Sequence, residues 1–120
     1  MVYEMVIEMI NEYKSIKIKM DKKFTESRDR LSVIQKEIND ILHIIEYHKV
    51  KVTVMSKLTK QLRLLHAERR ILKENVIIIE NILKNGKNPD DEISNSQKRN
   101  ARYEQEAAYC LNNFLTGVKL

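Results

Sequence analysis

Glycine and proline are almost missing from this sequence. Its 120 residues include two glycines and one proline, and none of them lies before Gly86. Both residue types interrupt helices and form tight turns, so the first 85 residues have few places at which the chain bends sharply. This absence favours long helices. It also excludes the glycine-rich loops with which many enzymes cradle phosphate groups.

Cysteine is equally scarce. The one cysteine, Cys110, cannot form an internal disulfide, which favours a reducing, cytoplasmic location. There is no basic leader followed by an apolar core, and the longest apolar run, residues 76–79, ends at Glu80. We therefore expect no association with a membrane.

The sequence carries no recognisable catalytic or metal-binding motif. Asp40, His43 and Glu46 have the three-residue spacing of a carboxylate–histidine metal site, but no other segment supplies matching ligands. We interpret these three residues as a solvated flank of a helix. No nucleophile is spaced to work with a histidine and a carboxylate. The sequence therefore predicts a protein that is not an enzyme and has no cofactor.

What the sequence does contain is two long apolar patterns with steps of three and four residues, which are typical of helices that pack along one face. They predict an all-α fold with one helix over about residues 2–48 and an antiparallel second helix over about 54–85. The first pattern is Tyr3, Val6, Ile10, Tyr13, Lys17, Met20, Phe24, Ser27, Leu31, Ile34, Ile38, Ile41, Ile45 and His48. The second is Met55, Leu58, Leu62, Leu65, Arg69, Leu72, Val76, Ile79 and Leu83.

The last third of the chain predicts a loop and a third helix within the same single domain, residues 1–120. Asn85 and Gly86 form a helix stop, and Pro89 follows in a polar stretch, so we expect a loop over 86–95. The third helix is expected over about 96–116. Its packing face is expected to consist of small and apolar residues: Ala101, Tyr103, Ala107, Ala108, Leu111, Phe114 and Leu115.

The two long helices differ in length by about 14 residues, or about 21 Å. The second helix can therefore cover the first only back to about Lys17 or Ile18. The third helix or a second copy of the chain could cover the apolar residues before that point, and we favour a homo-oligomer. The predicted oligomer interface is Tyr3, Val6, Met9, Ile10 and Tyr13.

The net charge of +5 is concentrated in one segment, because residues 49–87 contain ten Lys or Arg and three Asp or Glu. Arg63, His66, Arg69, Arg70 and Lys73 follow one another along about three turns there. The cluster is either a binding site for an anionic partner or a solvated helix face in which Arg69 pairs with a carboxylate such as Glu37. An anionic partner could be an acidic protein, a nucleotide or the backbone of a nucleic acid.

Residues 31–48 and 64–75, the latter containing Glu68-Arg69-Arg70, resemble segments of small helical-hairpin accessory proteins of phages and prophages of Gram-positive bacteria. The resemblance implies the cytoplasm of a bacterial host and no assigned chemistry. It predicts a non-enzymatic protein that inhibits a host or anti-phage defence component by binding a protein or sequestering an anionic signal nucleotide. The alternatives are a DNA- or RNA-associated accessory factor that uses the basic second helix, and a structural or assembly coiled coil.

Overall fold

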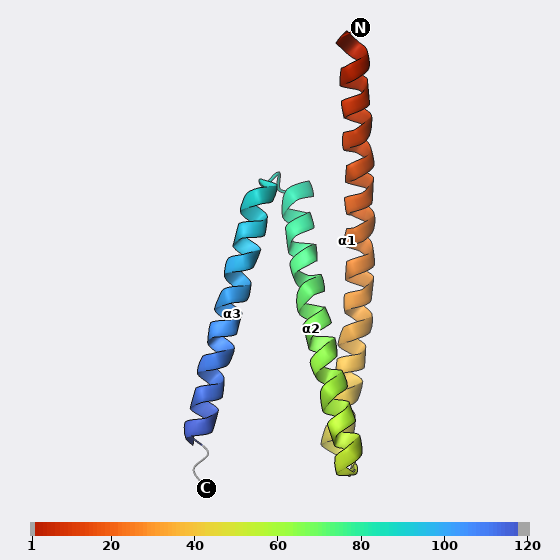
Figure 1. Cartoon of the computed structure of the whole chain (residues 1–120). Coiled ribbons are helices and arrows are strands. Elements are labelled where there is room, and N and C mark those ends of the chain that lie inside the picture. The colour runs from red at the N-terminus through yellow and green to blue at the C-terminus, as the bar shows by residue number, and fades with distance from the viewer. Residues whose placement is uncertain (1, 118–120) are drawn as a thin grey trace.

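The protein consists of three helices joined by short connections, as the computed structural model shows for residues 2–117 (Figure 1). Helix α1 spans Val2–Tyr47, α2 spans Val52–Leu83 and α3 spans Pro89–Gly117. Helix α2 runs back along α1, and α3 reverses again on the far side of α2. The all-α hairpin with a third helix is confirmed. The molecule is an elongated rod with extents of 77 × 29 × 20 Å.

The hairpin is held by a narrow apolar seam between α1 and α2. Ile34, Ile38 and Ile41 of α1 and Leu65 of α2 are its buried residues. Ile45, Leu58, Leu62 and Leu72 pack around them. All of these positions belong to the two patterns of three- and four-residue steps. Steps of that size keep side chains on one face of a helix, which is why the sequence forms this pair of helices.

Helix α3 begins at Pro89, so the prediction of a loop as far as residue 95 is wrong. The chain reverses through Gly86, whose φ of +62° is a conformation that glycine adopts without strain. The Asn88 side chain then accepts hydrogen bonds from the backbone N–H groups of Asp90 and Asp91, at 2.9 and 3.3 Å. Asn88 thus caps the helix, and Pro89 suits its first position because proline has no N–H to leave unpaired.

The predicted packing face of α3 is also wrong. Helix α3 contacts α2 through its polar first half, and the two helices then diverge (Figure 1). Every residue from 101 to 117 is exposed, including all seven residues of the apolar face predicted from the sequence. The reason is that polar side chains, described below, hold the first half of α3 against α2.

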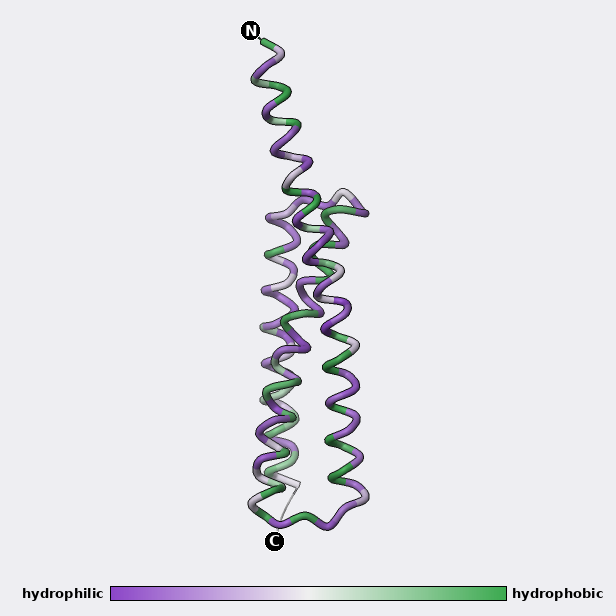
Figure 2. The backbone as a smooth tube through the Cα atoms, turned by 90° about the vertical axis from the view of Figure 1, so that its right-hand side faces the viewer, coloured by the Kyte–Doolittle hydropathy of each residue, from purple (hydrophilic) through white to green (hydrophobic). Residues whose placement is uncertain are grey.

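The first residues of α1 extend beyond the rest of the molecule (Figure 2). Residues 2–19 are all exposed, and Met20 is the first residue that is partly covered. We call residues 2–19 the overhang. Its position agrees with the difference in length between the first two helices. Over residues 2–117, no helix combines the length and the apolar character needed to cross a bilayer.

Candidate functional site

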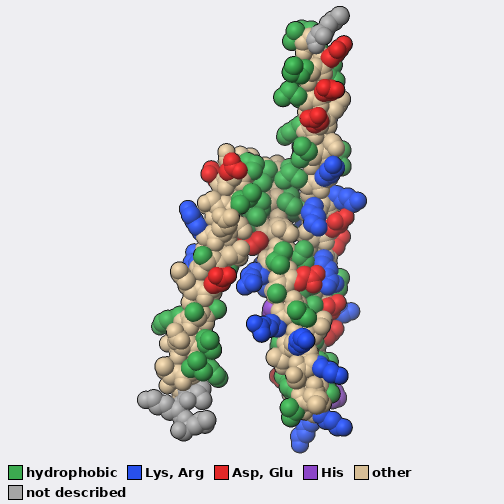
Figure 3. Space-filling model, in the orientation of Figure 1, with side chains coloured by type: hydrophobic (Ala, Val, Ile, Leu, Met, Phe, Trp, Pro, Cys, Tyr) green, Lys and Arg blue, Asp and Glu red, His purple; other side chains and the backbone are tan. Residues whose placement is uncertain are grey.

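The five cationic residues singled out in the sequence lie together on α2. Arg63, His66 and Arg70 line one hollow. Arg69, Arg70 and Lys73 line a second one next to it, together with Glu74, Ile77 and Tyr103. Because Arg70 belongs to both hollows, the cluster is continuous. We call Arg63, His66, Arg69, Arg70 and Lys73 the cationic flank. Figure 3 shows lysine and arginine side chains along the side of α2 that faces the diverging half of α3.

Arg69 does not pair with Glu37, as one interpretation of the sequence expected. Its Nε donates a hydrogen bond of 3.1 Å to the side-chain oxygen of Gln35, a neutral group. The Gln35 nitrogen in turn donates to Asn39, which fixes the oxygen toward Arg69. Glu37 lies 3.9 Å from Arg30 instead. The positive charge of Arg69 is therefore oriented by α1 without being neutralised.

The acidic residue within the cluster, Glu68, is directed away from it. Arg30 of α1 donates two hydrogen bonds to the Glu68 carboxylate, at 2.9 and 3.2 Å. These bonds lower the pKa of Glu68 and keep it charged, but on the side of α2 that faces α1. Glu68 thus contributes to the hairpin and not to the compensation of the cationic flank.

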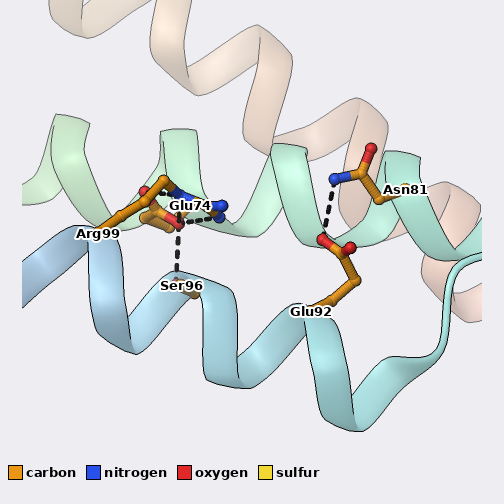
Figure 4. Close-up of polar contacts among 5 residues, drawn as sticks. All are labelled: Glu74, Asn81, Glu92, Ser96 and Arg99. Atoms are coloured by element: carbon orange, nitrogen blue, oxygen red, sulfur yellow. Dashed lines mark hydrogen bonds and ion pairs between the residues drawn. The ribbon is translucent and has the colours of Figure 1, made fainter.

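The next carboxylate along α2, that of Glu74, is also paired with side chains of a neighbouring helix (Figure 4). It is buried between α2 and α3, where the Arg99 Nη2 lies 2.7 Å from one of its oxygens and Ser96 donates a hydrogen bond of 2.8 Å. The bonds from Arg99 lower the pKa of Glu74, and the bond from Ser96 adds to this against the opposing effect of burial. A second polar contact, from Asn81 to Glu92 at 2.8 Å, lies nearer the connection.

The interface between α2 and α3 was missed in the sequence because it is polar. Hydrophobic periodicity does not reveal it. The available signal was the spacing of Glu92, Ser96 and Arg99, which places three polar side chains on one face of a helix. If Asn88 is taken as the N-cap, the predicted third helix starts at Pro89 and includes these three residues.

Within the described residues the cationic flank forms no ion pair, although Glu74 lines one of its hollows and the charge of Lys73 helps to lower the Glu74 pKa. Between residues 2 and 117, no carboxylate lies within 4.0 Å of any of its five side chains. Three guanidinium groups can each offer forked N–H donors to a carboxylate or a phosphate. This arrangement can bind an anion.

The other candidates from the sequence show no comparable grouping. Asp40, His43 and Glu46 are exposed, and the His43 ring packs against Tyr47 at 4.7 Å. Over residues 2–117, no three potential ligands come together around a metal position. The predicted oligomer residues are all exposed on the overhang: Tyr3, Val6, Met9, Ile10 and Tyr13.

No known protein family, curated protein or solved structure matches this chain. The geometry of its own surface is therefore the basis for assigning a function.

Proposed function

We propose that this chain is a non-enzymatic binding protein that docks an anionic partner on the cationic flank. The observation that carries the proposal is the separation of charge around α2. Glu68 and Glu74 are both held by arginines from neighbouring helices, Arg30 and Arg99. The cationic flank consequently has five cationic or titratable basic side chains and no ion pair of its own, and such an excess of positive charge attracts anions.

An acidic protein surface is the partner that the shape favours. The hollow of Arg63, His66 and Arg70 is lined by α2 alone and open on its other side, whereas small-molecule sites usually enclose most of their ligand. Taken with the resemblance to phage accessory proteins, this supports inhibition of a host or anti-phage defence protein. Sequestration of an anionic signal nucleotide is the second form of the same proposal, with Tyr103 beside the flank as a surface on which a base could stack.

Self-association through the overhang is the other part of the proposal. Ten large apolar side chains of residues 2–18 are exposed, which is a high density for a free helix end. A second copy that covers them would remove this surface from water.

The test compares the wild type with Arg63→Gln/Arg70→Gln, which removes two charges and keeps the Arg69–Gln35 bond. Lys49→Gln/Lys51→Gln, with the same loss of charge outside the flank, is the matched control. The probe is a fluorescein-labelled polyglutamate peptide at about 100 mM salt, read by anisotropy. We expect at least about a tenfold weaker Kd for the flank variant, as for the loss of charge-assisted hydrogen bonds, and little change for the control.

Equal weakening in both variants would overturn the proposal, because it would show attraction by net charge alone. Two further probes separate the alternatives. A labelled 20-base-pair duplex whose affinity falls by orders of magnitude between about 50 and 200 mM salt would support the nucleic-acid accessory factor instead. A rise in melting temperature with a stoichiometric nucleotide would support the sequestration of a nucleotide.

A further inference from the structure

Two apolar surfaces of the molecule are left uncovered, and they lie at opposite ends. One is the overhang, at the end of the rod where α2 turns into α3. The other is the continuation of the α3 face that contacts α2. Glu92, Ser96 and Arg99 make that contact, and the same three- and four-residue steps lead on to exposed residues at Tyr103, Ala107, Cys110 and Phe114.

The facing wall of α2 is cationic. From Glu74, steps of three and four residues lead back along α2 to Arg70, Ala67, Arg63 and Lys60, all exposed. Because α3 diverges, a groove remains open between this wall and the apolar face of α3 (Figure 3). We call it the α2–α3 groove. An occupant that suits it is apolar on one side and acidic on the other.

Residues 2–13 of the overhang have this character. At 100° per residue its apolar side chains cover an arc of about 200°, with Val6, Ile10 and Tyr13 near the middle. Glu8 and Glu12 lie on the remaining side, and residues 2–13 contain no lysine or arginine. Lys14, Lys17 and Lys19 follow, so the acidic side belongs to residues 2–13 and not to the whole overhang. With residues 2–13 placed in the α2–α3 groove, the helix would turn its apolar arc toward α3 and its glutamates toward Arg63 and Arg70.

The lengths also agree. The overhang of 18 residues is about 27 Å long, and the 17 exposed residues at the end of α3 measure about 26 Å. A twofold axis perpendicular to the rod exchanges its two ends. It brings the overhang of each copy to the open end of the other copy's groove, so one operation fills both grooves.

We propose that two copies of this chain exchange their overhangs, each lying in the α2–α3 groove of the other. The inference rests on the self-association part of the proposed function and names what covers the overhang. It also implies competition, because the exchanged overhang and an external anionic partner would both use Arg63 and Arg70. Direct pairing of two overhangs is the simpler dimer, but a single partner helix covers a narrower strip than 200° and leaves the α3 face in water.

The native Cys110 in the groove allows a direct test by disulfide cross-linking of the full chain with Ile10→Cys. Ile10 belongs to the overhang and Cys110 to the last part of α3, and these two segments lie at opposite ends of the rod (Figure 1). A link between the two residues can therefore form only between two copies. The matched control is Asn11→Cys, one residue away but on the acidic side of the overhang. After mild oxidation, peptide mapping is expected to show the 10–110 link, at least about fivefold more abundant than the 11–110 link.

The possible outcomes are distinct. A 10–10 link that persists in Ile10→Cys/Cys110→Ser, or a dominant 110–110 link, overturns the exchange while self-association stands. A monomer in sedimentation at high concentration overturns both.

Charge reversal provides a second readout that does not depend on thiols. Glu8→Lys/Glu12→Lys is expected to weaken the dimer at least tenfold. Arg63→Glu/Arg70→Glu added to the same chain is expected to restore it, and a failure to restore it contradicts the pairing.

Discussion

At the scale of single residues, the junction between α2 and α3 depends on one buried carboxylate. Glu74 receives hydrogen bonds from both Ser96 and Arg99, so three residues from two helices form one polar unit. Such a unit stabilises its interface only while every member is paired, because a buried charge that loses its partner is costly. The hydrogen bonds of Glu74 thus go to α3, and none of them goes to Arg70, one turn away on the same helix.

Because of this junction, the stability of the fold is expected to fall at acid pH. The pKa of Glu74 is lowered from its ordinary value of 4.5, chiefly by Arg99. A lowered pKa means that the contribution to stability is complete above pH 4.5 and is lost as the pH falls through the lower, folded-state pKa. We expect the difference in free energy of unfolding between wild type and Glu74→Gln to be largest near neutrality and to shrink below pH 4.5, as measured by urea denaturation. Glu46→Gln, an exposed site, controls for the general loss of one negative charge.

At the scale of the elements, the hairpin has a core only one layer thick. Ile38 is 2% exposed within it, whereas Val33 on the same helix is 47% exposed. Ile38→Ala is expected to lower the free energy of unfolding by about 2 to 4 kcal/mol, because it removes buried apolar contacts and leaves a cavity. Val33→Ala is expected to cost less than about 1 kcal/mol. Urea denaturation with similar losses for both would show that the seam does not lie along Ile38.

Helices that pack through apolar side chains can be predicted from the sequence, whereas a helix held by polar contacts cannot be placed in the same way. Helices α1 and α2 meet through Ile and Leu, so their periodicity predicts both the helices and their contact face, with ends within two residues of those observed. Helix α3 is held by Glu92, Ser96 and Arg99, whose pairing depends on the three-dimensional register of two helices. A hydrophobic pattern therefore points to the wrong half of α3.

The same distinction applies to the candidate site. That Arg63, His66, Arg70 and Lys73 share a flank follows from helical spacing alone. The partner of Arg69 does not, because Gln35 and Glu37 are both near in an antiparallel register and side-chain orientation decides between them. The ion pairs that Glu68 and Glu74 form outside the flank likewise depend on Arg30 and Arg99, which lie far away in the sequence.

At the scale of the whole molecule, the rod is unequal at its two ends, with an apolar helix protruding at one and an open groove at the other (Figures 1 and 3). If two copies cover each other's ends, stability depends on concentration by mass action. We expect the melting temperature to rise by about 3 °C for each tenfold increase in concentration, given a dimer of this size.

Ile10→Asp is expected to abolish that dependence, since it places a charge in the middle of the apolar arc of the overhang. Val33→Asp, on the exposed side of the hairpin, is expected to retain it. Differential scanning fluorimetry across two decades of concentration measures both. A melting temperature that is independent of concentration in the wild type would contradict self-association.

The order of contacts also has a kinetic consequence. Within residues 2–117, α1 touches α2 and α2 touches α3, but α1 and α3 do not meet. Every long-range contact thus joins two successive helices. Folding can therefore start at the turn of residues 48–51 and add contacts between α1 and α2 progressively away from it. Topologies of this local kind fold in microseconds to milliseconds, fast enough for the chain to complete its hairpin soon after synthesis.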